Sequence, residues 1–142
     1  MVCGGNTDRN PMAKAILEQI LIKRGLQDKI FVDSAARYHP TAPTATVQAR
    51  ETIRQIYGCD LLAGHKSKSV KDIDLAQYHL ILTMEAKHKV GLAPNKTYTL
   101  KEFAGLAGDI EDPYHKPLTE YLRCAKEITQ CLELIVDRIV PK

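Results

Sequence analysis

The feature that most constrains this chain lies in its first twelve residues, where a cysteine and an arginine flank a glycine-rich stretch ahead of a helix. The stretch reads Cys3-Gly4-Gly5-Asn6-Thr7-Asp8-Arg9. Glycine, asparagine and aspartate tolerate tight or left-handed backbone conformations, so this composition favours a compact loop. Asn10 and Pro11 then provide an N-cap and a first-turn proline, and apolar residues follow at helical spacing from 12 to about 24.

A loop that wraps back on itself at a helix N-terminus directs several backbone N–H groups toward one point, where the helix dipole adds positive potential. That point suits a phosphate dianion, and it also lowers the pKa of a cysteine thiol and makes it nucleophilic near neutral pH. Arg9 adds a planar pair of donors that matches phosphoryl oxygens. The sequence therefore predicts a phosphoryl-transfer site with Cys3 as nucleophile and the backbone from Gly4 to Arg9 as the phosphate cradle. The simpler interpretation is a buried core cysteine and a surface arginine.

This stretch resembles the phosphate-binding loop of the low-molecular-weight protein tyrosine phosphatase family, whose pattern is a hydrophobic strand, V-C-x-G-N-x-C-R-S-P and a helix. The matching residues are Val2, Cys3, Gly5, Asn6, Arg9 and Pro11. Asp8 stands where the family often has a second cysteine, and Asn10 where it has serine. The family's general acid lies in an Asp-Pro-Tyr loop near the C-terminus, and this chain has Asp112, Pro113 and Tyr114. Two motifs in the right order, far apart in the chain, make the resemblance specific.

The resemblance implies a reaction in two steps. Cys3 would attack phosphorus in line while protonated Asp112 gives its proton to the leaving group, and water would then hydrolyse the cysteinyl-phosphate with Asp112 as base. Arg9 and the loop amides would bind the equatorial oxygens, so we expect neither a metal nor a cofactor. On sequence grounds Asp109 and Glu111 compete with Asp112 for the role of the acid, and the resemblance selects Asp112.

Further residues match the family's supporting network and its substrate cleft. In the family an asparagine, the serine after the arginine, a serine after the second strand and a histidine form hydrogen bonds around the loop. Asn6, Ser34 and His65 occupy matching places, whereas Asn10 replaces the serine hydroxyl, and an amide N–H could donate to the thiolate in its stead. Tyr114 is expected to form a wall of the cleft. Taken alone, His65 also fits an exposed loop histidine, and Tyr114 a loop-packing aromatic.

The expected partner is a phosphorylated protein or a small phosphomonoester, with phosphate or another oxyanion in the loop. Thr7 is similar to the bacterial members that act on phosphoarginine, and tyrosine-directed members commonly have a larger aliphatic residue such as isoleucine there. Residues 99–114 also look more like those bacterial proteins. Phosphotyrosine and phosphoarginine both stay open as substrates.

Three other functions compete with a phosphatase. An arsenate reductase needs resolving cysteines that reach the loop; residues 84–95 contain none, and Cys124 and Cys131 lie on the predicted last helix. A phosphoryl-anion binding module without turnover is suggested by Asp8, by Asn10 and by the short first strand. A sugar-transport phosphocarrier also uses a cysteine loop, but it lacks the partnering arginine.

Predicted strands and helices alternate along the chain, which indicates an α/β fold with a mainly parallel sheet. We expect strands at 29–33, 80–84 and 96–100, helices at 12–24, 46–57 and 118–139, and a Pro/Thr/Ala-rich loop between Ser34 and Thr46. The resemblance implies three layers, with a twisted four-stranded sheet between helices and the phosphate loop between the first strand and the first helix. One domain over residues 1–142 is expected. Since parallel strands place ligands at their carboxyl ends, the Cys3 loop, Ser34 and the Asp112 loop are expected to meet at one edge.

Charge and composition exclude some classes of partner. The formal net charge of +3 is too small to indicate nucleic-acid binding. No apolar run approaches a membrane span and no segment has the pattern of a signal peptide, so we expect no membrane partner and a cytoplasmic protein. The four cysteines lack metal-binding spacing and are expected to be free thiols.

Overall fold

A parallel sheet of four strands forms the centre of the computed structural model, which describes residues 1–140. The strands are β1 (Val2–Cys3), β2 (Ala35–Ala36), β3 (Ile81–Thr83) and β4 (Thr97–Thr99). Their order is β2-β1-β3-β4, and all three pairings are parallel. Val2 pairs with Ala35 on one side and with Thr83 on the other. The strand that leads into the glycine-rich loop is therefore central, although it contains only two residues.

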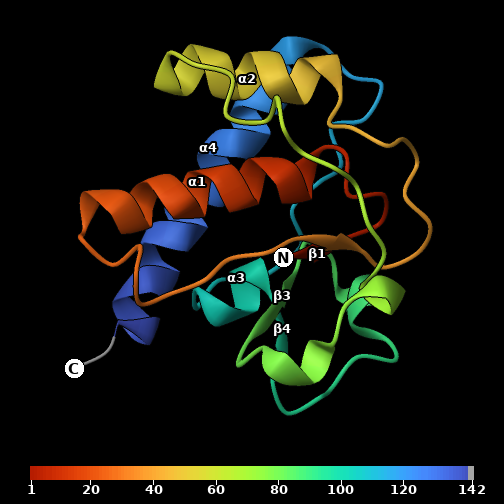
Figure 1. Ribbon diagram of the computed structural model, residues 1–142, viewed down its shortest axis with the longest axis vertical. Helices are drawn as coiled ribbons and strands as arrows, with labels where there is room; N and C mark the ends of the chain where they lie inside the picture. Colours follow the sequence, from red (N-terminus) through yellow and green to blue (C-terminus); the bar gives the residue numbers. More distant parts are fainter. Residues whose placement is uncertain (141–142) are drawn as a thin grey trace.

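Helices lie on both faces of this sheet (Figure 1). The α-helices are α1 (Arg9–Lys23), α2 (Val47–Tyr57), α3 (Leu100–Phe103) and α4 (Leu118–Ile139), and the 3₁₀ helices are η1 (Val70–Asp72), η2 (Leu75–Gln77) and η3 (Ala86–Lys89). Because side chains alternate along a strand, Cys3 and Leu82 point into the large core with α1 and α4, whereas Val2 and Ile81 pack beneath η1. The predicted three-layer α/β fold is confirmed.

The two longer predicted helices beyond the loop also form where periodicity and end signals place them. Thr46 caps α2 by accepting a hydrogen bond from the Ala49 N–H at 3.1 Å, and Gly58 ends the helix in a left-handed conformation with φ of 80°. Helix α4 buries one stripe against the rest of the core. Its members are Tyr121, Cys124, Ala125, Ile128, Cys131, Leu132, Ile135 and Val136.

Replacing Leu132 with alanine should lower the free energy of unfolding by about 2–5 kcal/mol, because the side chain is completely buried and its loss leaves a cavity. Leu134→Ala is the matched control on the same helix, since Leu134 is 43% exposed and its removal should change stability by only about 0.5 kcal/mol. Chemical denaturation of both variants measures the difference. Equal losses would show that α4 does not bury the face described above.

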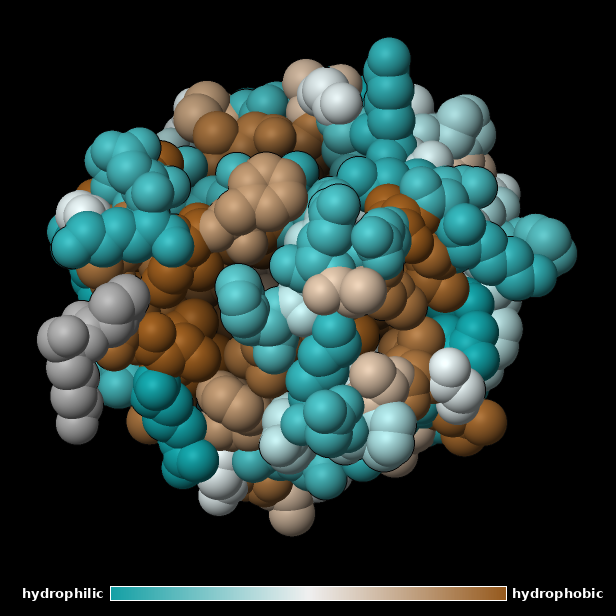
Figure 2. Space-filling model, turned by 60° about the horizontal axis from the view of Figure 1, so that its bottom comes forward, coloured by the Kyte–Doolittle hydropathy of each residue, from teal (hydrophilic) through white to brown (hydrophobic). Residues whose placement is uncertain are grey.

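The predicted strand at 29–33 is wrong, because the strand in this part of the chain is Ala35–Ala36. A strand needs a partner for its backbone groups, and β1 extends only over Val2–Cys3. Residues 29–33 instead line an apolar cavity of about 530 Å³ together with Leu82 and Ile135. Figure 2 shows a face of the molecule on which apolar side chains gather around a hollow. As a result Ser34 precedes its strand and does not lie at the carboxyl end.

The start of the first helix also differs from the prediction. Helix α1 begins at Arg9, so the N-cap position belongs to Asp8 and not to Asn10, and Pro11 still lies in the first turn. The predicted strands at 80–84 and 96–100 are confirmed within a residue or two as β3 and β4. Over residues 1–140, no helix has the length and apolarity that crossing a bilayer requires.

Candidate active site

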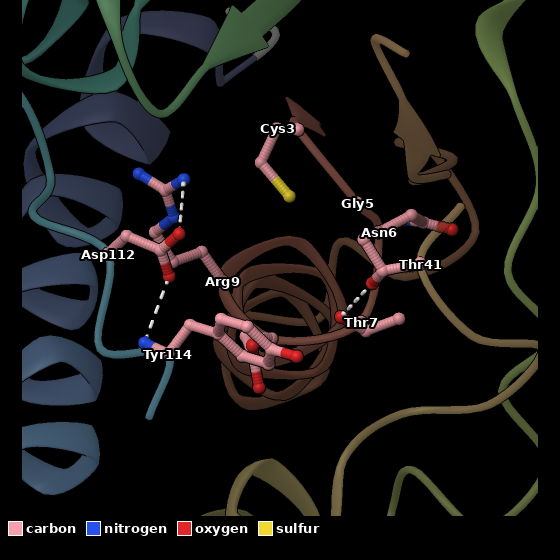
Figure 3. A pocket seen from close by; sticks show the side chains of 10 residues that line it. Cys3, Gly5, Asn6, Thr7, Arg9, Thr41, Asp112 and Tyr114 are labelled. Atoms are coloured by element: carbon pink, nitrogen blue, oxygen red, sulfur yellow. Dashed lines mark hydrogen bonds and ion pairs between the residues drawn. The ribbon is translucent and has the colours of Figure 1, made fainter. Parts of the chain in front are cut away.

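A cavity of about 70 Å³ opens where β1 ends and α1 begins. Seven of the ten residues that line it come from the glycine-rich loop, and three come from elsewhere: Thr41, Asp112 and Tyr114 (Figure 3). The loop and the Asp-Pro-Tyr segment, far apart in sequence, thus form a single site, as the parallel topology predicts.

The loop is held in shape around Asn6, which adopts a left-handed conformation with φ of 58° and is fully buried. The Asn6 carbonyl accepts hydrogen bonds from His65 Nε2 at 2.8 Å and from the Ser67 hydroxyl at 3.0 Å. The Asn6 side-chain oxygen accepts from the Lys68 N–H at 3.2 Å. Burial lowers the pKa of His65, which favours the neutral ring whose Nε2–H donates this bond. The structure therefore brings His65 to Asn6 as expected and adds Ser67, which sequence reasoning missed.

Cys3 lies at the floor of the cavity and is almost entirely buried. Burial raises the pKa of the Cys3 thiol, and it outweighs the Arg9 charge and the backbone N–H groups of Asn6, Asn10 and Gly5, which act in the opposite direction. The pKa of Cys3 is therefore raised, whereas its position at a helix N-terminus predicted a lowered pKa. These donors are the groups that could stabilise a thiolate or a bound oxyanion at this position.

Arg9 connects the loop to the C-terminal part of the site. Its guanidinium is almost fully buried, and Nη1 donates a hydrogen bond to the Ile110 carbonyl at 2.7 Å. Nη2 lies 3.1 Å from Glu85 Oε2 and 3.6 Å from Asp112 Oδ2. Figure 3 shows Asp112 and Arg9 facing each other beside Cys3. Sequence reasoning missed Glu85, although its place two residues after the end of β3, at the same edge of the sheet as Cys3, could have indicated it.

Three acids lie close together in this segment, namely Asp109, Glu111 and Asp112. Of these three, only Asp112 lines the cavity. One of its carboxylate oxygens accepts a hydrogen bond from the Tyr114 N–H at 3.1 Å, and the carboxylate is half exposed. Asp109 accepts instead from the Ala86 N–H, and Glu111 pairs with Lys116. The geometry therefore favours Asp112 as the group that can exchange a proton with a bound molecule. The Tyr114 ring is half exposed and forms part of the rim, as predicted.

Asp8 and Asn10, the two departures from the family pattern, both have partners outside the cavity centre. The Asp8 carboxylate accepts a hydrogen bond from the Thr46 hydroxyl, and burial raises its pKa. The Asn10 side chain donates to the Ala35 carbonyl at 2.7 Å, so the donor that it offers Cys3 is its backbone N–H. The Thr46 hydroxyl thus gives the Asp8 carboxylate a hydrogen-bond partner within the protein.

Ser34 is not part of the site. It is buried and does not line the cavity, and its backbone N–H donates to Asp33 Oδ1 at 2.8 Å. Among residues 1–140 the structure has no hydrogen bond from Ser34 to Asn6, Asn10 or His65, which corrects the expected network. The cause is the displaced strand, because Ser34 lies at the amino end of β2 while the cavity lies at the carboxyl ends.

All four cysteines are free thiols, as expected. Cys124 and Cys131 are buried in α4, and burial raises the pKa of Cys124 to about 12. Neither of them lines the cavity at Cys3. A thiol with so high a pKa is a poor nucleophile, so nothing in this arrangement favours a redox relay to Cys3. Nor do residues 1–140 contain a cluster of side chains suited to a metal ion.

The comparisons with known proteins agree with this geometry. The sequence model for low molecular weight phosphotyrosine protein phosphatase matches residues 1–141. A protein-arginine-phosphatase from Geobacillus stearothermophilus is 34% identical, with 99% of this chain and 92% of the relative covered. The crystal structure of a low molecular weight protein tyrosine phosphatase from T. tengcongensis has a TM-score of 0.88 at 35% identity, with 97% of this chain and 96% of that chain covered.

A third relative is a cysteine-to-serine mutant of the YwlE arginine phosphatase, whose structure carries a phosphorylated active-site serine. It matches with a TM-score of 0.87 at 28% identity, covering 97% of this chain and 92% of that one. The match to the family extends over nearly the whole chain and includes every residue that lines the cavity. The chain therefore belongs to the low molecular weight phosphotyrosine protein phosphatase family and is a phosphatase of that type.

Proposed function

We propose that this phosphatase removes phosphoryl groups from phosphoarginine in proteins through a cysteinyl-phosphate on Cys3. The observation that carries the proposal is the convergence of Cys3, Arg9 and Asp112 on one small cavity. The match of the family to residues 1–141 supports a single catalytic domain. A free thiol at Cys3 fits a reducing compartment, which supports the cytoplasm as the place of action.

In the proposed first step Cys3 attacks phosphorus as the thiolate, so that a P–S bond forms while the P–N bond to the arginine side chain breaks. Asp112 gives its proton to the leaving nitrogen. In the second step water attacks phosphorus and gives a proton to Asp112, the P–S bond breaks, and inorganic phosphate and the thiolate result. Arg9 and the loop N–H groups stabilise the charge on the equatorial oxygens in both steps.

Phosphoarginine is favoured by the polarity of the cleft. Thr7 and Thr41 place two hydroxyls on its wall, and the carboxylate of Asp112 lies among the residues that line it. A guanidino leaving group carries several N–H donors, which hydroxyl and carboxylate oxygens accept. The similarity to a protein-arginine-phosphatase also favours phosphoarginine as the substrate. Phosphotyrosine is the second candidate, because the exposed Tyr114 ring at the rim offers a surface on which a phenyl ring can stack.

The test is turnover of para-nitrophenyl phosphate in the presence of a metal chelator, followed by peptides that carry phosphoarginine or phosphotyrosine. We expect turnover to persist with the chelator, and kcat/KM for the phosphoarginine peptide to exceed that for phosphotyrosine by about tenfold or more. The reverse preference would select the second candidate. Absence of turnover while vanadate still binds would instead indicate an anion-binding module, with Asp8 and Asn10 as the first residues to exchange for their family counterparts.

A further inference from the structure

The loop between β2 and α2 packs directly on the phosphate-binding loop. The Thr41 N–H donates to the Gly5 carbonyl at 3.4 Å, and the Thr46 N–H donates to the Thr7 carbonyl at 3.1 Å. These two contacts span the middle and the end of the Pro/Thr/Ala-rich segment, whose composition alone gave no indication of a role. The segment is therefore held against the phosphate-binding loop, and Thr41 is its residue that lines the cavity.

Within this segment the side chain of Thr41 reaches the cavity itself. Its hydroxyl lies 3.2 Å from the Thr7 hydroxyl, and both residues line the cavity (Figure 3). A Cβ on Gly5 would lie only 2.8 Å from Thr41 Oγ1, so the absence of a side chain at Gly5 is what lets Thr41 approach this closely. The contact between the two threonines thus depends both on the glycine at position 5 of the phosphate-binding loop and on the position of the loop between β2 and α2.

A threonine hydroxyl has one donor and two acceptor positions, and its direction follows from the rotation about χ1. Thr7 is nearly buried, with a single side-chain partner for its hydroxyl in the described residues, namely Thr41. The pairing holds the Thr7 oxygen at the cavity wall, where its remaining acceptor position can meet an N–H of a guanidino group. A phenolic ester has no such N–H, so the orientation of Thr7 matters less for phosphotyrosine.

We propose that Thr41 is a positioning residue for Thr7, and that through this hydroxyl pair it raises the preference of the cleft for phosphoarginine over phosphotyrosine. The inference rests on the proposed function and deepens it, since it assigns part of the substrate preference to a loop outside the two catalytic motifs. Thr41 acts through Thr7 and takes no part in the chemical steps.

The experiment compares Thr41→Val, which keeps the shape but removes the hydroxyl, with Thr41→Ser, which keeps the hydroxyl. The readout is the ratio of kcat/KM for a phosphoarginine peptide to kcat/KM for the matching phosphotyrosine peptide. Losing one hydrogen bond in Thr41→Val should lower this ratio about fivefold, and Thr41→Ser should keep it within about twofold. The double variant Thr7→Val/Thr41→Val should have the ratio of Thr7→Val alone, because the two hydroxyls act as one unit.

The proposal is overturned if Thr41→Val leaves the ratio unchanged, or if the two valine substitutions lower it by independent factors that multiply. Since Thr41 lies at the surface, its variants should fold, and their melting temperatures check this. Thr41→Ala gives a second variant without the hydroxyl. A wild-type enzyme that hydrolyses para-nitrophenyl phosphate but not phosphoarginine would contradict the proposed function itself, which distinguishes that failure from a failure of Thr41 alone.

Discussion

Replacing Cys3 with serine is expected to lower turnover by at least about a thousandfold while leaving the fold and the anion site intact. The serine hydroxyl is a far weaker acid than a thiol, and in the proposed first step Asp112, the acid of the same cavity, already carries the proton for the leaving group and cannot take the hydroxyl proton. The backbone donors and Arg9, which bind the oxyanion, are unchanged by the substitution. Activity on para-nitrophenyl phosphate, together with vanadate binding and the melting temperature, measures the two halves of this prediction.

Cys59→Ser is the matched control, because Cys59 is exposed and does not line the cavity. It removes a thiol from the chain and should leave turnover near the wild-type rate. Intact-mass measurement after incubation with substrate adds a direct test of the covalent step: the wild type quenched during turnover should carry one phosphoryl group on Cys3. A Cys3→Ser enzyme with more than about a tenth of wild-type activity would contradict the proposed nucleophile.

Replacing Asp112 with asparagine should lower kcat by about a hundredfold to a thousandfold for substrates with a poor leaving group. Asparagine has the same shape and can still accept the hydrogen bond from the Tyr114 N–H, so the loop should keep its conformation. It cannot give up a proton to the leaving atom. The loss should therefore be much smaller for para-nitrophenyl phosphate, whose leaving group needs little protonation, than for phenyl phosphate.

Asp109→Asn is the control for this substitution, since Asp109 accepts a hydrogen bond from the Ala86 N–H and does not line the cavity. It removes the same charge three positions away and should leave the dependence on the leaving group as in the wild type. Equal losses for good and poor leaving groups in Asp112→Asn would argue against proton transfer by Asp112. Asp112 would then act only as an ion-pair partner of Arg9.

The sequence predicts those parts of the site that depend on residues close together in the chain. Cys3 and Arg9 lie in one short loop, and their spacing and the helix after them are visible in the chain itself. Asp112 was selected from three acids by the resemblance to the family, and the geometry agrees because the other two acids have partners elsewhere. The helices at 46–57 and 118–139 follow from their end signals and apolar stripes in the same local way.

The remaining features depend on contacts between distant segments. The β-branched run at 29–33 has the composition of a strand, but β1 provides no backbone partner along it. Thr41 and Glu85 became part of the site only because the sheet brings their loops to the carboxyl end of β1. The raised pKa of Cys3 likewise reflects burial, which the sequence around a cysteine does not specify.

The three contacts of the Arg9 guanidinium have a consequence for the thermodynamics of substrate binding. A free arginine side chain can lose about 2 kcal/mol of rotamer entropy when it is fixed in one conformation. In this protein the Ile110 carbonyl, Glu85 and Asp112 already restrict Arg9, so much of that entropy is lost during folding and not when a phosphoryl group arrives. Affinity for the oxyanion is then set mainly by charge and desolvation, because the arginine that meets it is already ordered.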